Sequence, residues 1–277
     1  MDAYRSPAQL MESCAASGAV KARRPAAQLF LLGVLAGALI AFGCVATNTA
    51  VYGIADTWTA RTVSALLFPF GLGMVVITGA ELFTGNCLIS VSLLEGRCSL
   101  RGMLRNWLIV YPANLLGSLL VAALCVFFGQ LNYSGGRLAV YTMQVAAAKC
   151  ALPFGNAFML GVLCNVLVCI AVLLATSGAD TASRLLGAYL PICFFVLSGF
   201  EHSVANMYYI GAGLMAKTVP AYALLAAEEG LNLSALTVGG FALGNLLPVT
   251  LGNIVGGVSL GVIFHEIHLP SKSRQRA

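Results

Sequence analysis

Three ionisable residues interrupt long apolar runs of this 277-residue chain: Glu81, Glu201 and His202. A charged side chain at the centre of a membrane helix costs about 2.5 to 3.5 kcal/mol on insertion scales, so such residues require partners or a function. Histidine exchanges protons around neutral pH, which makes His202 the candidate for proton chemistry. The glutamates are interpreted either as ligands of a passing ion or as hydrogen-bond partners of unpaired backbone at helix breaks.

The composition requires that these residues lie in a membrane protein. Hydrophobic residues make up 59% of the chain and charged residues 9%, whereas soluble domains carry about 25% charged residues. A span needs about 20 apolar residues, so the length allows roughly six crossings and no separate soluble domain. The net charge of +5 is therefore assigned to membrane orientation, and no nucleic-acid partner is predicted.

Six uncharged stretches are the candidate spans of an all-α integral membrane protein. They are 25–55, 62–80, 106–136, 150–179, 185–200 and 230–264. The second and fifth run into Glu81 and into Glu201 with His202, and apolar sequence then resumes. These two spans are predicted to be broken helices.

The basic residues separate across this arrangement. With the amino terminus inside, eleven lie on the inner side and four on the outer side. The inner set is Arg5, Lys21, Arg23, Arg24, Arg97, Arg101, Arg105, Arg184, Lys272, Arg274 and Arg276, and the outer set is Arg61, Arg137, Lys149 and Lys217. The positive-inside rule then predicts a multi-pass protein of the inner (plasma) membrane with both termini cytoplasmic. The expected parts are a cytoplasmic tail (1–27), a six-helix channel domain (28–264) and a second cytoplasmic tail (265–277).

The two halves of the chain repeat a motif. The pattern G-x-E-x-x-x-x-N occurs at residues 79–86 and again at residues 199–206, and F-x-L-G-V-L occurs at 30–35 and 158–163. Three spans in each half give the repeats opposite orientations, and inverted repeats of this kind build transport paths at their interface. Glu81, Asn86 and Asn206 are accordingly assigned to the helix breaks. His202 has Leu82 as its counterpart, so only one half carries the histidine.

Other signals in the sequence have structural interpretations. Nine cysteines without a C-x-x-C pair are interpreted as small hydrophobic residues. Several G-x-x-x-G spacings predict close helix packing. No phosphate loop, dinucleotide fingerprint or nucleophile elbow is present, so neither an enzyme nor a cofactor or metal site is predicted. Lys149 is interpreted as either an interfacial anchor or an anion attractor.

The runs G-A-E-L-F-T-G-N at 79–86 and S-G-F-E-H-S-V-A-N-M at 198–207 resemble the formate/nitrite transporter family. The resemblance implies an aquaporin-like protomer of two inverted three-helix repeats, assembled as a homopentamer with one pore in each protomer. It further implies transport of small monovalent anions such as formate, nitrite or hydrosulfide.

The same resemblance assigns roles to individual residues. His202 matches the central pore histidine, with Thr84 near it. Apolar constrictions are implied at Leu72, Phe83 and Val168 towards the cytoplasm and at Phe68 and Phe195 towards the outside. Lys149, Asn165 and Glu201 match the polar cluster of the outer vestibule. The chain has Glu81 and Gly85-Asn86 where some formate channels carry other polar residues, which leaves the substrate open.

These inferences predict a channel embedded in the lipid bilayer that carries small anions, formate first, and whose histidine assists by proton transfer. An unpaired anion is too costly to bury in an apolar constriction, so a protonated or proton-coupled species is expected to cross. The alternative is a neutral-solute channel of the water or glycerol type. The paired N-P-A motifs expected of that class are absent from the chain.

Overall fold

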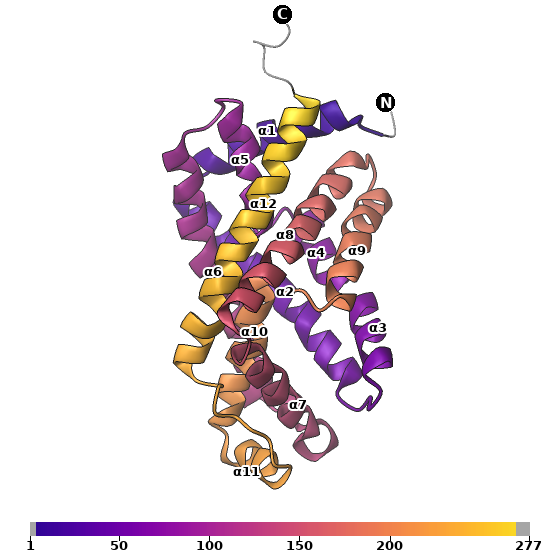
Figure 1. Ribbon diagram of the computed structural model, residues 1–277, viewed down its shortest axis with the longest axis vertical. Coiled ribbons are helices and arrows are strands. Elements are labelled where there is room, and N and C mark those ends of the chain that lie inside the picture. Colours follow the sequence, from indigo (N-terminus) through magenta and orange to yellow (C-terminus); the bar gives the residue numbers. More distant parts are fainter. Residues whose placement is uncertain (1–3, 270–277) are drawn as a thin grey trace, which may run out of the picture.

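The computed structural model describes residues 4–269, and the regular elements in this part are helices (Figure 1). The α-helices are α1 (Pro7–Arg23), α2 (Ala26–Val51), α3 (Thr57–Leu67), α4 (Pro69–Thr78), α5 (Ile89–Leu94), α6 (Leu100–Phe127), α7 (Tyr133–Cys150), α8 (Phe154–Ser177), α9 (Thr181–Leu197), α10 (Ser203–Lys217), α11 (Pro220–Glu228) and α12 (Leu247–His268). Short 3-10 segments, η1 (Gly85–Leu88) and η2 (Gln130–Asn132), and a π-helical turn, η3 (Gly240–Leu246), complete the order.

Five helical segments are long and apolar enough to cross a membrane: α2, α3 with α4, α6, α8, and η3 with α12. A sixth arises if α10 and α11, which meet at 94°, count as one span. The prediction of an all-helical membrane protein is therefore confirmed. The expected fifth span corresponds to α9, whose 17 residues reach about 26 Å at 1.5 Å per residue, less than the roughly 30 Å of hydrocarbon.

Small residues let the longest helices approach closely. Helix α2 packs along α6, and α8 packs along α12. A Cβ atom added at Gly37 would lie 2.7 Å from the backbone carbonyl carbon of Asn114, and one at Gly256 would lie 3.0 Å from that of Val162. The close packing predicted from the G-x-x-x-G spacings is confirmed at these positions, where backbone meets backbone.

Gly256→Val is expected to lower the free energy of unfolding by about 1 to 3 kcal/mol or more, because the added side chain overlaps the rigid backbone of α8. Thermal unfolding of the detergent-solubilised protein measures the effect. Gly155→Val is the matched control, since nothing lies within 4 Å of a Cβ at Gly155. Equal midpoints for the two variants would contradict the packing argument.

Three helices lie where the sequence predicted tails or loops. Helix α1 begins with a capping box at Ser6 and buries Met11 and Ala15, so residues 7–23 pack onto the body of the protein. Helix α7 places Lys149 in its last turn rather than in a loop. Both helices carry small residues on their buried sides and too little continuous apolar sequence to register as spans, which is why hydropathy alone missed them. Helix α11, with 9 residues, is too short to register as a span by itself.

Several predicted boundaries also shift. Helix α6 starts at Leu100 because the Ser99 side chain accepts a hydrogen bond from the Gly102 N–H and caps it. The final span begins at Gly240, ten residues later than predicted, and α12 continues to His268, into the predicted carboxy-terminal tail. His265 is buried there and contacts Glu95 at 2.7 Å. Residues 270–277, with Lys272, Arg274 and Arg276, lie outside the described residues.

Candidate functional site

Two non-helical segments lie at the predicted breaks. Helix α4 ends at Thr78 and η1 begins at Gly85, while α9 ends at Leu197 and α10 begins at Ser203. Gly79 and Gly199 each have φ +70°, the left-handed conformation that ends a helix and favours glycine. The helices therefore end at equivalent glycines of the two repeated motifs, and each glutamate follows two residues later.

In each half, a buried asparagine side chain makes hydrogen bonds to the backbone of the non-helical segment. Asn114 Nδ2 donates to the carbonyl oxygens of Gly33 (2.8 Å) and Glu81 (2.9 Å), and its Oδ1 accepts from the Phe83 N–H (2.9 Å). One side chain thus pairs two backbone groups of the non-helical segment, the Glu81 carbonyl and the Phe83 N–H, and ties them to the Gly33 carbonyl of α2. Lipid has no hydrogen-bonding groups with which to do so.

Asn253 has the same role in the other half. Its Nδ2 donates to the carbonyl oxygens of Gly161 (2.8 Å) and Glu201 (3.0 Å), and its Oδ1 accepts from the Ser203 N–H (2.9 Å). Both asparagines are fully buried. The two segments are therefore held by equivalent contacts from α6 and α12.

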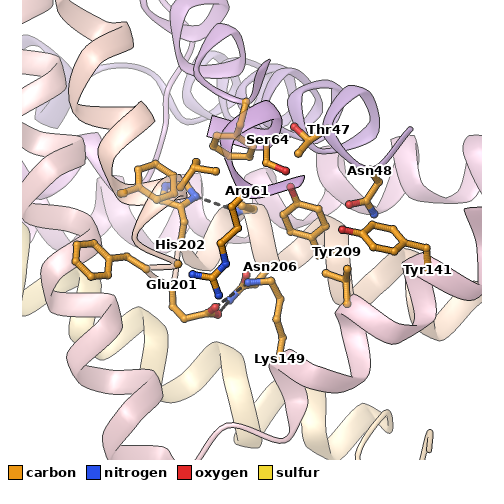
Figure 2. Close-up of a pocket in the computed structure, with 17 residues that line it drawn as sticks. Thr47, Asn48, Arg61, Ser64, Tyr141, Lys149, Glu201, His202, Asn206 and Tyr209 are labelled. Carbon is orange, nitrogen blue, oxygen red and sulfur yellow. Dashed lines mark hydrogen bonds and ion pairs between the residues drawn. The ribbon is translucent and has the colours of Figure 1, made fainter. Parts of the chain in front are cut away.

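Glu201 lies in a cluster of polar groups (Figure 2). Its carboxylate accepts from Lys149 Nζ at 2.8 Å and from Asn206 Nδ2 at 2.6 Å. Asn206 Nδ2 also donates to Asn245 Oδ1 at 2.7 Å. The Glu201 side chain is only 7% exposed, so Lys149 and the amides supply the partners that a buried carboxylate requires.

Glu81 has an equivalent cluster with one additional cation. Asn86 Nδ2 donates to the carboxylate at 2.6 Å, and Lys21 Nζ lies 3.3 Å from it. Arg24 Nη1 donates to the other oxygen at 2.9 Å. Lys21 and Arg24 come from α1 and the turn that follows it, so the amino-terminal segment completes this cluster.

Contacts with the ends of other helices hold α1 in place. Arg97 Nη2 donates to Glu12 Oε2 at 2.6 Å, and Arg105 Nη1 donates to the Arg24 carbonyl at 2.9 Å. The hydrogen bond from Arg97 lowers the pKa of Glu12 below its ordinary value. The Glu12 carboxylate therefore stays ionised to lower pH than it would without Arg97.

Each cluster opens into a cavity. The Lys149 pocket, about 300 Å³, is lined by Arg61, Lys149, Glu201 and His202 together with Phe68 and Phe195 (Figure 2). The Lys21 pocket, about 310 Å³, is lined by Lys21, Arg24, Glu81 and Arg184 together with Leu72 and Leu82. Phe68 precedes α4 and Gly79 ends it, so the two pockets lie at opposite ends of this helix.

His202 and Thr84 meet between the two pockets. Thr84 Oγ1 lies 2.9 Å from His202 Nε2, and both residues are buried. His202 Nδ1 accepts from the Ala205 N–H at 3.0 Å and caps α10. Since Nδ1 accepts, the neutral ring carries its proton on Nε2 and donates it to Thr84. The starts of η1 and α10, which directly follow Thr84 and His202, bring two positive helix ends to this point.

The five expected constriction residues are all buried. The Phe68 and Phe195 rings pack edge to face, with centroids 5.6 Å apart, and Phe195 stacks on the His202 ring at 5.9 Å. Leu72 lines the Lys21 pocket. Phe83, whose ring packs against Tyr111, and Val168 lie in the core and line neither of the two pockets.

Asn165 lies away from the place that the resemblance implied. It is absent from the lining of the Lys149 pocket, and its Nδ2 donates to the carbonyl oxygens of Thr84 (3.2 Å) and Asn253 (2.6 Å). The side-chain amide of Asn165 therefore binds the backbone of Thr84, the residue that contacts His202. It does not contact Lys149 or Glu201.

Several residues of the site had no assigned role in the sequence analysis. They are Lys21 and Arg24, Asn106 and Asn245, Asn114 and Asn253, Leu82, Arg61 and Arg184. For the asparagines a signal existed: N-L-L-G at 114–117 and N-I-V-G at 253–256 are related. For Lys21 and Arg24 there was none, because a basic amino-terminal segment is typical of any membrane protein with a cytoplasmic tail.

Comparisons with known proteins give a single family. The model of the formate/nitrite transporter family matches residues 8–266. The chain is 37% identical to the probable formate transporter of Methanothermobacter thermautotrophicus, over 92% of this chain and 93% of that protein. It is 38% identical to the formate channel FocA of Haemophilus influenzae, over 84% of each. A solved structure described as a pentameric formate channel with formate bound matches with a TM-score of 0.78 and 34% identity, over 88% of this chain and 98% of that one.

Proposed function

The chain belongs to the formate/nitrite transporter family, and on this premise we propose that it is a plasma-membrane channel for small monovalent anions, with formate as the first substrate. Nitrite and hydrosulfide are the further candidates. The family and the relatives described above are channels and transporters, not enzymes. A channel function accounts for buried charged groups that have no catalytic arrangement.

Six crossings arranged as two inverted three-helix repeats fit this function. In this proposal the second span is α3 with α4, interrupted before η1 and α5, and the fifth is α9, interrupted before α10. The equivalent hydrogen bonds of Asn114 and Asn253 support the relation between the halves. The aquaporin-like channel domain of residues 28–264 would then take in α1 as well, since α1 completes the Glu81 cluster.

The observation that carries the proposal is the pair of polar pockets at opposite ends of α4, with the Thr84–His202 contact between them. The route would enter one pocket, pass Phe68 and Phe195 at His202, and leave by the other. Phe83 and Val168 would pack behind the residues that line the route and hold them in position. Asn165 would act by holding the Thr84 carbonyl.

Proton transfer would let the anion pass the apolar region. A bare anion among Phe68, Phe195 and Leu72 would lose its hydration without gaining a partner. Cations of the pockets and the positive helix ends at Thr84 and His202 would draw it inward. His202 would be charged by a proton from the pocket, which opens the hydrogen bond from the Ala205 N–H to Nδ1, and would return to neutral by giving one proton to the anion, so that the neutral acid crosses.

Assembly and orientation extend the proposal. A homopentamer with one pore in each protomer is supported by the likeness to the pentameric formate channel. Both termini on the cytoplasmic side follow from the distribution of Lys and Arg along the chain. Cross-linking of membranes and cysteine labelling from each side would test these two points.

Uptake into proteoliposomes tests the function directly. Formate, nitrite, hydrosulfide and uncharged glycerol are compared at two pH values, with protein-free liposomes as the control. Anion uptake that rises as pH falls, without glycerol uptake, is the expected result. Glycerol flux without an anion signal would favour the neutral-solute alternative, which the two or more cations in each pocket argue against.

A further inference from the structure

We propose that Arg61 and Arg184 are the residues that capture the anion, one in each pocket, and that they select two-oxygen anions such as formate and nitrite over hydrosulfide. This inference rests on the proposed function as an anion channel. It assigns a different role to the lysines of the pockets. Lys149 and Lys21 would neutralise the buried glutamates and position the non-helical segments.

Each lysine is already paired with a buried glutamate, and Glu81 is shared between Lys21 and Arg24. Lys149 Nζ lies 2.8 Å from Glu201 Oε1, and Lys21 Nζ lies 3.3 Å from Glu81 Oε2 and 2.7 Å from Asn86 Oδ1. The Lys149–Glu201 pair is neutral overall, so its attraction for a third charge falls off much more steeply with distance than that of a lone cation. The Glu81 cluster keeps one positive charge, shared by Lys21 and Arg24 and drawn towards the buried carboxylate.

Within the described part of the chain, Arg61 and Arg184 carry charges that have no carboxylate partner. Each lines its pocket, and neither joins an ion pair among residues 4–269. The Arg61 guanidinium lies against the backbone of Gly199, where an added Cβ would be 3.4 Å from Nη1. Figure 2 shows its side chain reaching across the pocket towards Glu201 and Lys149. Among residues 4–269, the Arg184 side chain donates from Nε to the Gly178 carbonyl at 3.2 Å, and its terminal nitrogens have no hydrogen-bond partner there.

Both arginines are positioned by the same local structure. Asp56 caps α3 by accepting from the Thr59 N–H at 2.7 Å, and Asp180 caps α9 by accepting from the Ser183 N–H at 2.9 Å. An arginine follows each aspartate within the first turns, in the runs D-T-W-T-A-R and D-T-A-S-R. Each half therefore carries one arginine near the start of the helix that leads to its break, five residues after Asp56 in α3 and four after Asp180 in α9.

The shape of the guanidinium group determines which anions it binds most tightly. Its planar fork donates two parallel hydrogen bonds to a group with two oxygen atoms, whereas an ammonium acts as a point charge. Formate and nitrite each present two oxygens in one plane, and hydrosulfide presents a single sulfur. Arginine in both pockets would thus bind formate and nitrite more tightly than hydrosulfide, a difference that charge alone does not provide.

The test measures anion uptake by proteoliposomes as a function of concentration and ionic strength. In the double variant Arg61→Gln with Arg184→Gln, the half-saturating formate concentration is expected to rise about tenfold or more. The dependence of uptake on ionic strength should also flatten. The Arg61→Lys with Arg184→Lys variant should recover hydrosulfide uptake but not formate or nitrite affinity. Arg137→Gln, at an exposed arginine of α7 that lines neither pocket, is the control for the loss of an arginine charge outside the pockets, and it is compared with each single variant, Arg61→Gln and Arg184→Gln.

The outcomes separate the inference from the function on which it rests. If the unmodified protein carries no anion, the proposed function fails. If it carries formate and the glutamine variant keeps the half-saturating concentration within twofold, with a normal unfolding temperature, the capture role is overturned. Equal losses for formate and hydrosulfide in the lysine variant would overturn the selectivity.

Discussion

Asn253→Leu is expected to lower the free energy of unfolding by at least about 3 kcal/mol. Leucine removes the hydrogen bonds to the Gly161 carbonyl, the Glu201 carbonyl and the Ser203 N–H. The Gly161 carbonyl belongs to the interior of α8, whereas the Glu201 carbonyl and the Ser203 N–H, at the break before α10, lose their partner. Each unpaired buried backbone group costs about 1 to 3 kcal/mol, and neither lipid nor the apolar core offers a replacement. Thermal unfolding of the purified protein in detergent should show the midpoint falling by about 6 °C or more.

Two further variants make this result specific. Asn114→Leu should cause a loss of the same size, because Asn114 makes the equivalent three hydrogen bonds in the first half. Asn156→Leu, an exposed asparagine near the start of α8, should leave the midpoint almost unchanged. If Asn253→Leu and Asn156→Leu unfold at the same temperature, the asparagine does not hold the non-helical segment.

His202→Asn is expected to remove the pH dependence of formate uptake and to lower its maximal rate by at least about tenfold. General acid–base assistance by a positioned side chain contributes about 10² to 10⁴ in rate where it operates. Asparagine is a good helix cap, so its Oδ1 should still accept from the Ala205 N–H and keep α10 in place. The substitution therefore removes the exchangeable proton and spares the fold.

Uptake is compared between pH 5 and pH 7, and the rate into protein-free liposomes is subtracted at each pH. His268→Asn, at the end of α12, is the matched control because it removes a histidine away from both pockets. An uptake rate that still rises with falling pH in His202→Asn would exclude the histidine as the proton donor. A folded variant is verified by its unfolding temperature.

The membrane class, the family and the central residues were predictable from the sequence. Hydropathy and charge frequency are properties of the chain itself, so a sequence with 9% charged residues and long apolar runs belongs in a membrane whatever its packing. The cost of burying a charge likewise singles out Glu81, Glu201 and His202. The repeated G-x-E-x-x-x-x-N motif located the two non-helical segments, which follow the helix ends at Gly79 and Gly199.

The tertiary structure decided which partners these residues have. The contact of Lys21 with Asn86 joins residues 65 apart, and that of Asn165 with the Thr84 carbonyl joins residues 81 apart. Such pairings depend on how α1 and α8 pack against η1 and the residue before it, and no local pattern of the chain records that packing. The same limit applies to Arg61, an ordinary surface residue in the sequence, because only the packing of α3 against α9 brings its guanidinium to Gly199 and into the Lys149 pocket.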